Sequence, residues 1–160
     1  MICKRLACCL CLFPSLFLVV FLNSCGRQEG GAYTPGLGEI MTLIQMRHSK
    51  LYFAGLAKNW PLASYEVKEL QEGFADVVHF HPTHQGSPVP LAALCSKLIQ
   101  VPLDQLQSAT QGRDLAKFKR AFQALTSSCN ACHEATHFAF NRVRIPQSNP
   151  FSNQSFGLPK

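Results

Sequence analysis

The sequence has few of the patterns that build a β-sheet or an enzyme active site. Its 160 residues contain no useful run that alternates apolar and polar side chains, and no internal repeat. It has no Ser/His/Asp set, no phosphate-binding loop and no paired carboxylates in a recognisable frame. Its Lys and Arg residues form no block of the kind that contacts nucleic acid. We therefore expect an all-α protein that binds no nucleic acid and offers no recognisable substrate site.

Charge is also scarce. Only 15% of the residues are charged, and the formal net charge is +6. Two of the basic residues, Lys4 and Arg5, stand at the start of the chain. Without them 13 basic residues face 9 acidic ones, which leaves +4. The remaining basic excess is weak, and the length corresponds to one domain with an extension at each end.

Residues 1–25 have the pattern of an export signal. Lys4 and Arg5 form a positive start, residues 6–22 are largely apolar, and a Leu-Asn-Ser-Cys sequence follows. That ending resembles a bacterial lipobox, in which Cys25 would carry the lipid and become the new N-terminus. An uncleaved anchor and ordinary cleavage nearby are the alternatives. We expect a periplasmic lipoprotein of a Gram-negative bacterium, attached to the membrane through its N-terminal lipid.

Residues 129–133 carry the main functional pattern. They read Cys-Asn-Ala-Cys-His, the C-x-x-C-H pattern of covalent haem attachment. On a helix Cys129, Cys132 and His133 share one face, so two thiols and an imidazole can meet one flat cofactor. The alternatives are a redox or zinc C-x-x-C followed by a chance histidine. A thioredoxin-type motif needs a βαβ context, which the sequence lacks. We expect one covalent haem c, with His133 as the proximal iron ligand.

The cysteine count agrees with export and haem attachment. Of eight cysteines, four leave with the leader, Cys25 takes lipid, and Cys129 and Cys132 take haem. Only Cys95 remains, so no internal disulfide framework can form in the finished protein. Cys95 lies among regularly spaced leucines, which predicts an inert buried thiol.

Apolar residues at helical spacing predict four helices. We place them at about 39–58, 61–80, 90–109 and 113–140, with Asn59 as an N-cap and Pro102 as a kink or break. Residues 26–38 should form a flexible tether, 39–140 an antiparallel four-helix bundle, and 141–160 an irregular tail. Phe151 and Phe156 are expected to tie the tail to the bundle.

The first expected helix has a mixed face that suits a cofactor. Met41, Gln45, His48 and Tyr52 follow one another at steps of four, three and four. Met41 is our first choice for the sixth iron ligand and His48 the second. Each has a simpler interpretation: Met41 as core packing, and His48 as a propionate partner or a surface residue.

With the haem motif late in the last of four helices, the chain resembles class II c-type cytochromes, the cytochrome c′ type of bundle. Residues 45–55 and 59–66 also look like a group of small uncharacterised exported bacterial proteins that share the Cys-Asn-x-Cys-His ending. The resemblance implies haem attachment at Cys129, Cys132 and His133. It also implies that the first helix supplies the residue facing the iron, and that a homodimer is possible.

Three functions remain open at this point. Electron transfer with redox partner proteins of the periplasm is our first expectation, because a haem with both axial positions filled passes only electrons. A five-coordinate, gas-binding protein would need an apolar distal residue such as Leu43 or Ile44. A peroxidase-like enzyme would need His48 as a distal acid or base. We expect the chain to be a carrier, not an enzyme.

Overall fold

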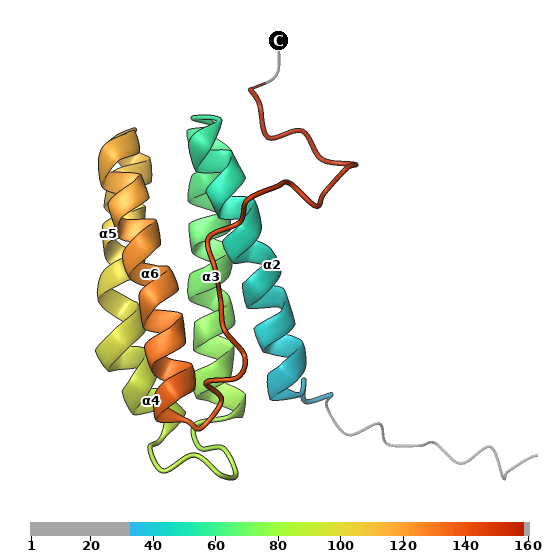
Figure 1. Ribbon diagram of the computed structural model, residues 1–160, viewed down its shortest axis with the longest axis vertical. Helices are drawn as coiled ribbons and strands as arrows, with labels where there is room; N and C mark the ends of the chain where they lie inside the picture. Colours follow the sequence, from blue (N-terminus) through green and yellow to red (C-terminus); the bar gives the residue numbers. More distant parts are fainter. Residues whose placement is uncertain (1–32, 159–160) are drawn as a thin grey trace, which may run out of the picture. The chain divides into compact units, whose positions relative to one another are not determined.

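The structure is a computed structural model that describes residues 33–158 (Figure 1). The expected signal peptide, Cys25 and most of the expected tether therefore lie outside the described residues. From Thr34 onward the chain forms one compact unit. Its helices are α2 (Leu37–Leu56), α3 (Trp60–Phe80), α4 (Leu91–Leu94), the π-helical turn η1 (Cys95–Ile99), α5 (Gln100–Gln111) and α6 (Leu115–Ala135). No strand occurs between residues 33 and 158, so the expected all-α class is confirmed.

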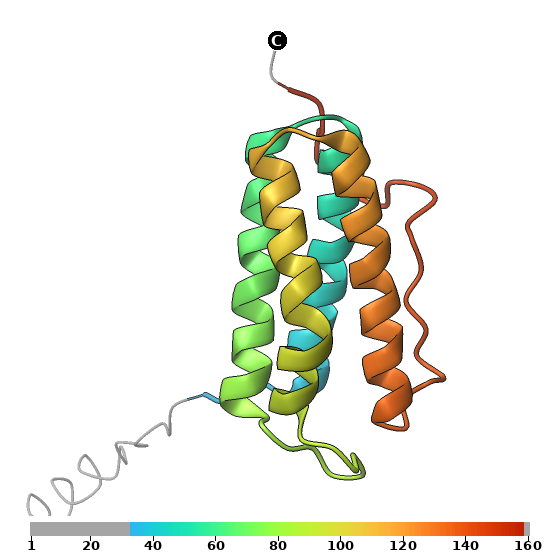
Figure 2. The same cartoon turned by 90° about the vertical axis from the view of Figure 1, so that its left-hand side faces the viewer.

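Four long helical segments form the bundle: α2, α3, the continuous run from α4 through η1 to α5, and α6 (Figures 1 and 2). The α2–α3 and α5–α6 connections lie at one end, and the loop between α3 and α4 lies at the other (Figure 2). Packing is closest between α2 and α3 and between α5 and α6, while α2 and α6 approach each other at fewer places. The boundary between α2 and α6 is therefore the least tightly closed of these interfaces.

Local sequence explains the helix starts. Asn59 is the N-cap of α3, as expected, and its side chain accepts a hydrogen bond of 3.3 Å from the backbone N–H of Leu62. Asp114 is the N-cap of α6, and its side chain accepts a hydrogen bond of 2.9 Å from the backbone N–H of Lys117. Lys58 and Arg113, which precede these caps, both adopt positive φ angles of 56° and 53°. Each reverses the chain within a few residues, which keeps consecutive helices adjacent.

The expected kink at Pro102 takes a different form. Pro102 is buried inside α5, and the irregularity lies one turn earlier, in η1. There the N–H of Gln100 bonds to the carbonyl of Cys95, five residues back. A proline has no N–H to donate, and its ring crowds the carbonyl four residues before it. The wider π turn makes room for that ring and keeps the helix going.

The last helix is shorter than its pattern predicted. It ends at Ala135, not at residue 140. The hydroxyl of Thr136 closes this end by donating a hydrogen bond of 3.0 Å to the carbonyl of Cys132. His137 then has a φ of 66°, in the left-handed region, so the chain turns away from the helix axis. A helix reaching residue 140 would have carried His137 one turn after His133, and that consequence of the predicted bounds is wrong.

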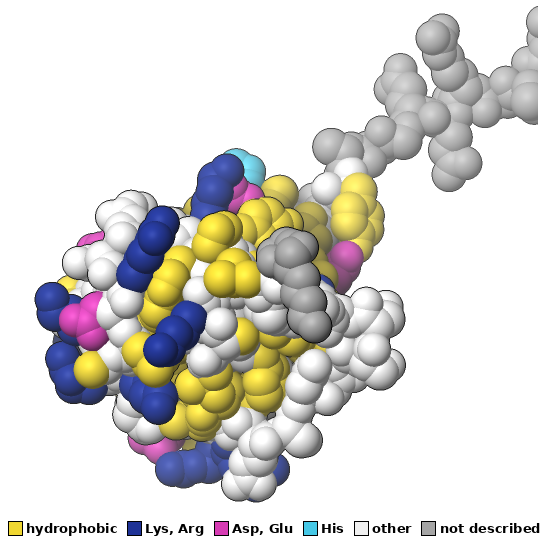
Figure 3. Space-filling view, turned by 90° about the horizontal axis from the view of Figure 1, so that it is seen from above, with side chains coloured by type: hydrophobic (Ala, Val, Ile, Leu, Met, Phe, Trp, Pro, Cys, Tyr) yellow, Lys and Arg dark blue, Asp and Glu magenta, His cyan; other side chains and the backbone are white. Residues whose placement is uncertain are grey.

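The core consists mostly of leucine and phenylalanine. Leu51, Leu70, Leu106, Phe118 and Phe122 are among its most deeply buried side chains. Seen from the end that carries the two short connections, apolar side chains show between the Lys and Arg side chains (Figure 3).

Aromatic residues attach the tail to this body, as expected. Phe156 is buried and its ring lies 5.6 Å from that of Phe53 on α2, while Phe151 is half-buried. The tail, red in Figure 1, runs back along the bundle from the end of α6. Trp60 packs against Phe118 of α6, with 6.1 Å between ring centres, so it anchors α3 to the last helix.

Among the described residues, none of the helices combines the length and the apolar character that crossing a bilayer requires.

Candidate functional site

One cavity of about 150 Å³ brings together five side chains that the sequence singled out. Cys129, Cys132 and His133 reach it from α6, and Met41 and His48 reach it from α2. The two groups are about 80 residues apart in the chain and meet across the loosely packed α2–α6 boundary. The structure thus places the sequence motif and the mixed face of the first helix around one space.

The remaining walls of this cavity are mainly apolar. Ile44 of α2, Phe74 of α3 and Ile99 of η1 are buried and close its inner side. Asn141 and Val143 of the tail cover its outer side. Residues of four helical elements, α2, α3, η1 and α6, therefore line the cavity together with one wall of irregular chain.

The two motif thiols lie in an environment that suppresses their ionisation. Burial raises the pKa of Cys129 to about 12, with smaller contributions from Cys132 and Cys95, and burial also raises the pKa of Cys132. A reactive C-x-x-C pair and a zinc-binding pair both work as thiolates, and redox pairs have lowered pKa values. The environment of these thiols therefore favours neither the redox nor the zinc interpretation of the motif.

His133 has the orientation expected of a metal-binding histidine. Its Nδ1 forms a hydrogen bond with the backbone carbonyl of Asn141. A carbonyl can only accept, so Nδ1 carries the proton. In the neutral ring this leaves Nε2 with its lone pair free. A histidine whose second nitrogen is fixed by a carbonyl is the usual arrangement at metal sites, because the bond sets both the tautomer and the ring orientation.

His48 is buried, with 4% of its surface exposed, and its partner fixes its tautomer. Its Nε2 lies 2.9 Å from Oγ1 of Thr126 on α6. The hydroxyl of Thr126 donates its own proton to the carbonyl of Phe122, also at 2.9 Å. The oxygen must therefore accept from His48, which places the proton on Nε2 and leaves Nδ1 unprotonated. Burial lowers the pKa of His48 to about 4, so the ring is neutral at neutral pH.

The other residues of the mixed face differ in their positions. Met41 is half-buried and lines the cavity, and Gln45 lines it from a more exposed position. Tyr52 does not line it, because its ring packs 4.9 Å from that of Phe122, one turn further along. Ile44 faces the cavity, whereas Leu43 is 52% exposed. Of the two apolar residues considered for the distal position, only Ile44 is placed to fill it.

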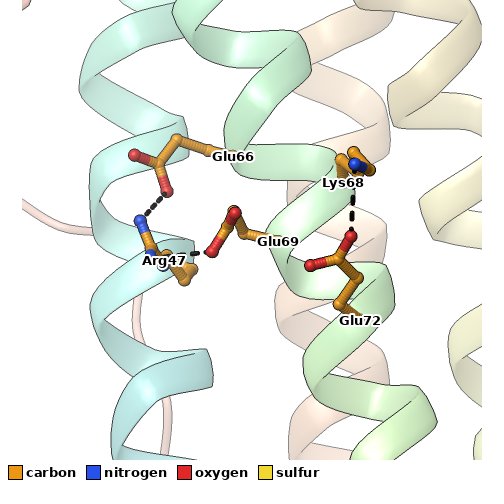
Figure 4. Close-up of polar contacts among 5 residues, drawn as sticks. All are labelled: Arg47, Glu66, Lys68, Glu69 and Glu72. Carbon is orange, nitrogen blue, oxygen red and sulfur yellow. Dashed lines mark hydrogen bonds and ion pairs between the residues drawn. The ribbon is translucent and has the colours of Figure 1, made fainter.

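Four basic residues near the mixed face or after the haem motif are candidates to pair with the haem propionates: Arg47, Lys50, Arg142 and Arg144. The first two have other partners. Arg47 pairs with Glu66 at 3.4 Å and with Glu69 at 2.7 Å, both on α3 (Figure 4). Desolvation raises the pKa of the buried Glu66 carboxyl, and Arg47 acts against that rise. Lys50 lies over the ring of Phe151, 5.1 Å from its centre.

The other two, Arg142 and Arg144, are exposed and alternate with the two cavity-lining residues of the tail. No described ion pair engages them, and each is a sequence neighbour of a cavity-lining residue.

The histidines of the loop between α3 and α4 point to separate partners. His81 donates from Nε2 to the carbonyl of Pro35 at 2.8 Å, and the ring of His84 lies 5.7 Å from that of Phe138. No group of three metal-ligating side chains is found in residues 33–158. Cys95 is buried, as expected, and burial raises its pKa to about 11.

Protein-family models, curated proteins and solved structures were compared with the chain, and none matches it. The site therefore has to be interpreted from its own residues. Sequence reasoning missed Thr126, Asn130 and Asn141, which hold His48, the tail and His133 respectively. Asn130 stands inside the haem motif, at a position where C-x-x-C-H accepts any residue. Its one signal was the Asn of the Cys-Asn-x-Cys-His ending, which did not indicate a contact with the tail.

Proposed function

We propose that this protein is an exported monohaem c-type cytochrome that transfers electrons, built as an antiparallel four-helix bundle. The observation that carries the proposal is the shared cavity, in which Cys129, Cys132 and His133 face Met41 and His48. The short connections after α2 and α5, and their position at one end of the bundle, support the antiparallel order (Figure 2).

The residues present fit a covalent haem. Cys129 and Cys132 would hold it through thioethers, and His133 offers an unprotonated Nε2 to the iron. When bound, the haem supplies a one-electron redox couple. The cavity of about 150 Å³ is smaller than the roughly 300–1000 Å³ of typical cofactor pockets, so its walls have to separate when haem binds. The tail wall, residues 141–143, is the one wall made of irregular chain, and its described hydrogen bonds to the bundle are those with Asn130 and His133 of α6.

The hydrogen bonds around the cavity disfavour ligation through one nitrogen of His48, Nε2, and the thioether chemistry of Met41 keeps it our first choice for the sixth ligand. Ligation through Nε2 of His48 would require breaking its bond to Thr126, a buried hydrogen bond. Met41 has no competing polar partner, and a thioether is a common distal ligand in c-type cytochromes. Met41 and His133 would both hold the iron, and the chemistry supplied there would be electron transfer.

A peroxidase-like enzyme is the second candidate, and the state of His48 favours it. The neutral ring lines the cavity, and its Nδ1 has a free lone pair. A positioned neutral imidazole is the usual proton acceptor in acid–base catalysis. This function requires that Met41 leave the distal position open.

The remaining proposals concern location and partners. We propose that residues 1–25 direct export and that lipid on Cys25 attaches the protein to the membrane of a Gram-negative periplasm, where redox proteins are its partners. The positive start, the apolar run and the Leu-Asn-Ser-Cys ending support this. Intact mass of the mature protein tests it, because a mature chain starting at an unmodified residue rules lipidation out.

Optical spectra of Met41→Ala and His48→Ala in both redox states test the ligand assignment. We expect Met41→Ala to become high-spin and to bind carbon monoxide rapidly, while His48→Ala stays low-spin. Met46→Ala is the matched control, because Met46 is half-buried on the same helix and does not line the cavity. A wild-type protein that is high-spin and binds carbon monoxide would instead support gas binding or catalysis.

A further inference from the structure

The tail is fastened to the haem motif by one side chain. Asn130 lies between the two motif cysteines, and its Oδ1 accepts a hydrogen bond of 2.8 Å from the N–H of Val143. Its Nδ2 donates to the carbonyl of Val143 at 2.9 Å and to the carbonyl of Thr126 at 3.1 Å. The amide thus pairs with both main-chain groups of one tail residue and is itself held by its own helix.

This pairing fixes the position of the group that His133 needs. Asn141, whose carbonyl accepts the proton of His133 Nδ1, is two residues before Val143. Asn141 and Val143 both line the cavity, and Arg142 between them does not. That alternation is typical of extended chain, so the position of Val143 sets that of Asn141.

The other restraints on this segment act at its start. The N–H of Phe138 bonds to the carbonyl of His133 at 2.7 Å, and the N–H of Asn141 bonds to the carbonyl of Phe138 at 2.9 Å. These close the turn after α6. Among the described contacts of residues 142–145, the hydrogen bonds are those with Asn130. Without Asn130, residues 142–145 would be held through the packing of Ile145, and the next restraints along the tail are Phe151 and Phe156.

We propose that Asn130 is a positioning residue for the proximal iron ligand. By clamping Val143 it holds the Asn141 carbonyl against His133 Nδ1, which keeps the proton on that nitrogen and presents Nε2 to the cavity. The clamp itself is independent of haem, whereas its effect on the iron rests on the proposed function. A hydrogen bond from Nδ1–H to a carbonyl makes imidazole a stronger electron donor. The clamp therefore lowers the reduction potential of the haem.

Limited trypsin digestion tests the clamp without reference to haem. The exposed Arg142 and Arg144 are cleavage sites inside the clamped segment. We expect Asn130→Ala to be cut there about ten-fold faster than wild type, because two hydrogen bonds to the segment are lost. Gln123→Ala is the control, since Gln123 is an exposed amide on α6 whose hydrogen bond goes to Ser127. Equal cleavage of wild type and Asn130→Ala would overturn the clamp.

Two measurements on the ferrous haem protein test the positioning role. We expect the Nδ1 proton of His133 to exchange with solvent at least ten-fold faster in Asn130→Ala, and the reduction potential to rise. Val143→Pro is a second variant, and it leaves the haem motif intact because Val143 lies outside the motif. It removes the N–H that donates a hydrogen bond to Oδ1 of Asn130. We expect it to change both quantities in the same direction.

The outcomes separate this inference from the proposed function. Faster cleavage with unchanged proton exchange and potential would leave Asn130 a tail clamp only and overturn the positioning role. If no haem attaches to the wild type, the proposed function fails, and the cleavage rates alone decide the clamp. If Asn130→Ala does not fold, Val143→Pro decides the positioning role through the exchange and potential measurements.

Discussion

Acidification should destabilise this protein through the protonation of His48. The ring is buried against Phe122, with 4.4 Å between ring centres, and donates to Thr126. Burial lowers its pKa from 6.5 to about 4. The folded protein therefore resists protonation at a pH where the unfolded chain accepts it. The stabilising contribution of the neutral ring is complete above pH 6.5 and is lost as the pH falls toward 4.

The size of the effect follows from that shift. A difference of about 2.5 pKa units corresponds to about 3 kcal/mol of unfolding free energy. Between about pH 7.5 and about pH 4.5 most of this, about 2.5 kcal/mol, should be lost. Glu66 acts in the opposite sense, because its raised pKa favours folding at low pH. A comparison with a His48 variant cancels that term.

Urea unfolding of wild type and His48→Gln at the two pH values measures this difference. The variant keeps an amide that can donate to Thr126 but does not titrate. We expect the unfolding free energy of wild type to fall by about 2.5 kcal/mol more than that of the variant. If both proteins lose the same free energy, the ring is not buried and neutral as the structure has it.

Two further substitutions test the packing and the charges of the bundle. In Gly55→Ala the new Cβ would collide with the ring of Phe118, so we expect thermal unfolding to show a loss of about 1–3 kcal/mol in stability. In the control Gly38→Ala the new Cβ meets nothing within 4 Å, so stability should change little. Equal effects of the two substitutions would contradict the close approach of Gly55 to Phe118. Arg47→Met removes the ion-pair partner of the buried Glu66 carboxylate, so we expect the unfolding free energy to fall by about 1–3 kcal/mol at neutral pH. This loss should shrink at lower pH, as Glu66 is protonated. A loss that does not depend on pH would contradict the pairing.

Helical periodicity and capping chemistry made most of the fold predictable. The helix starts could be read from Asn59 and from the spacing of apolar residues, because both act over a few neighbouring positions. The π turn before Pro102 was not predictable, since a proline can be accommodated by a kink, a break or a widened turn. The end of α6 was misplaced because Thr136 and His137 carry no strong stop signal.

The candidate site was predictable in its chemistry and not in its contacts. The C-x-x-C-H sequence identified three residues, and helical spacing on the first helix identified Met41 and His48. Which of Leu43 and Ile44 faces the cavity depends on the rotation of α2 against α3, which the pattern left open. The clamp of Asn130 on Val143 joins a side chain to main-chain atoms. Main-chain atoms are the same at every residue, so the sequence gives no indication of such a contact.

The absorption spectrum of the purified protein in alkaline pyridine tests the central claim most directly. We expect one haem per chain with the spectrum of a porphyrin whose two vinyl groups are saturated, and we expect the haem to stay with the chain after denaturation and acid–acetone extraction. Cys129→Ser with Cys132→Ser should abolish that retention. A wild-type protein that carries no haem, or releases it on extraction, would contradict the account.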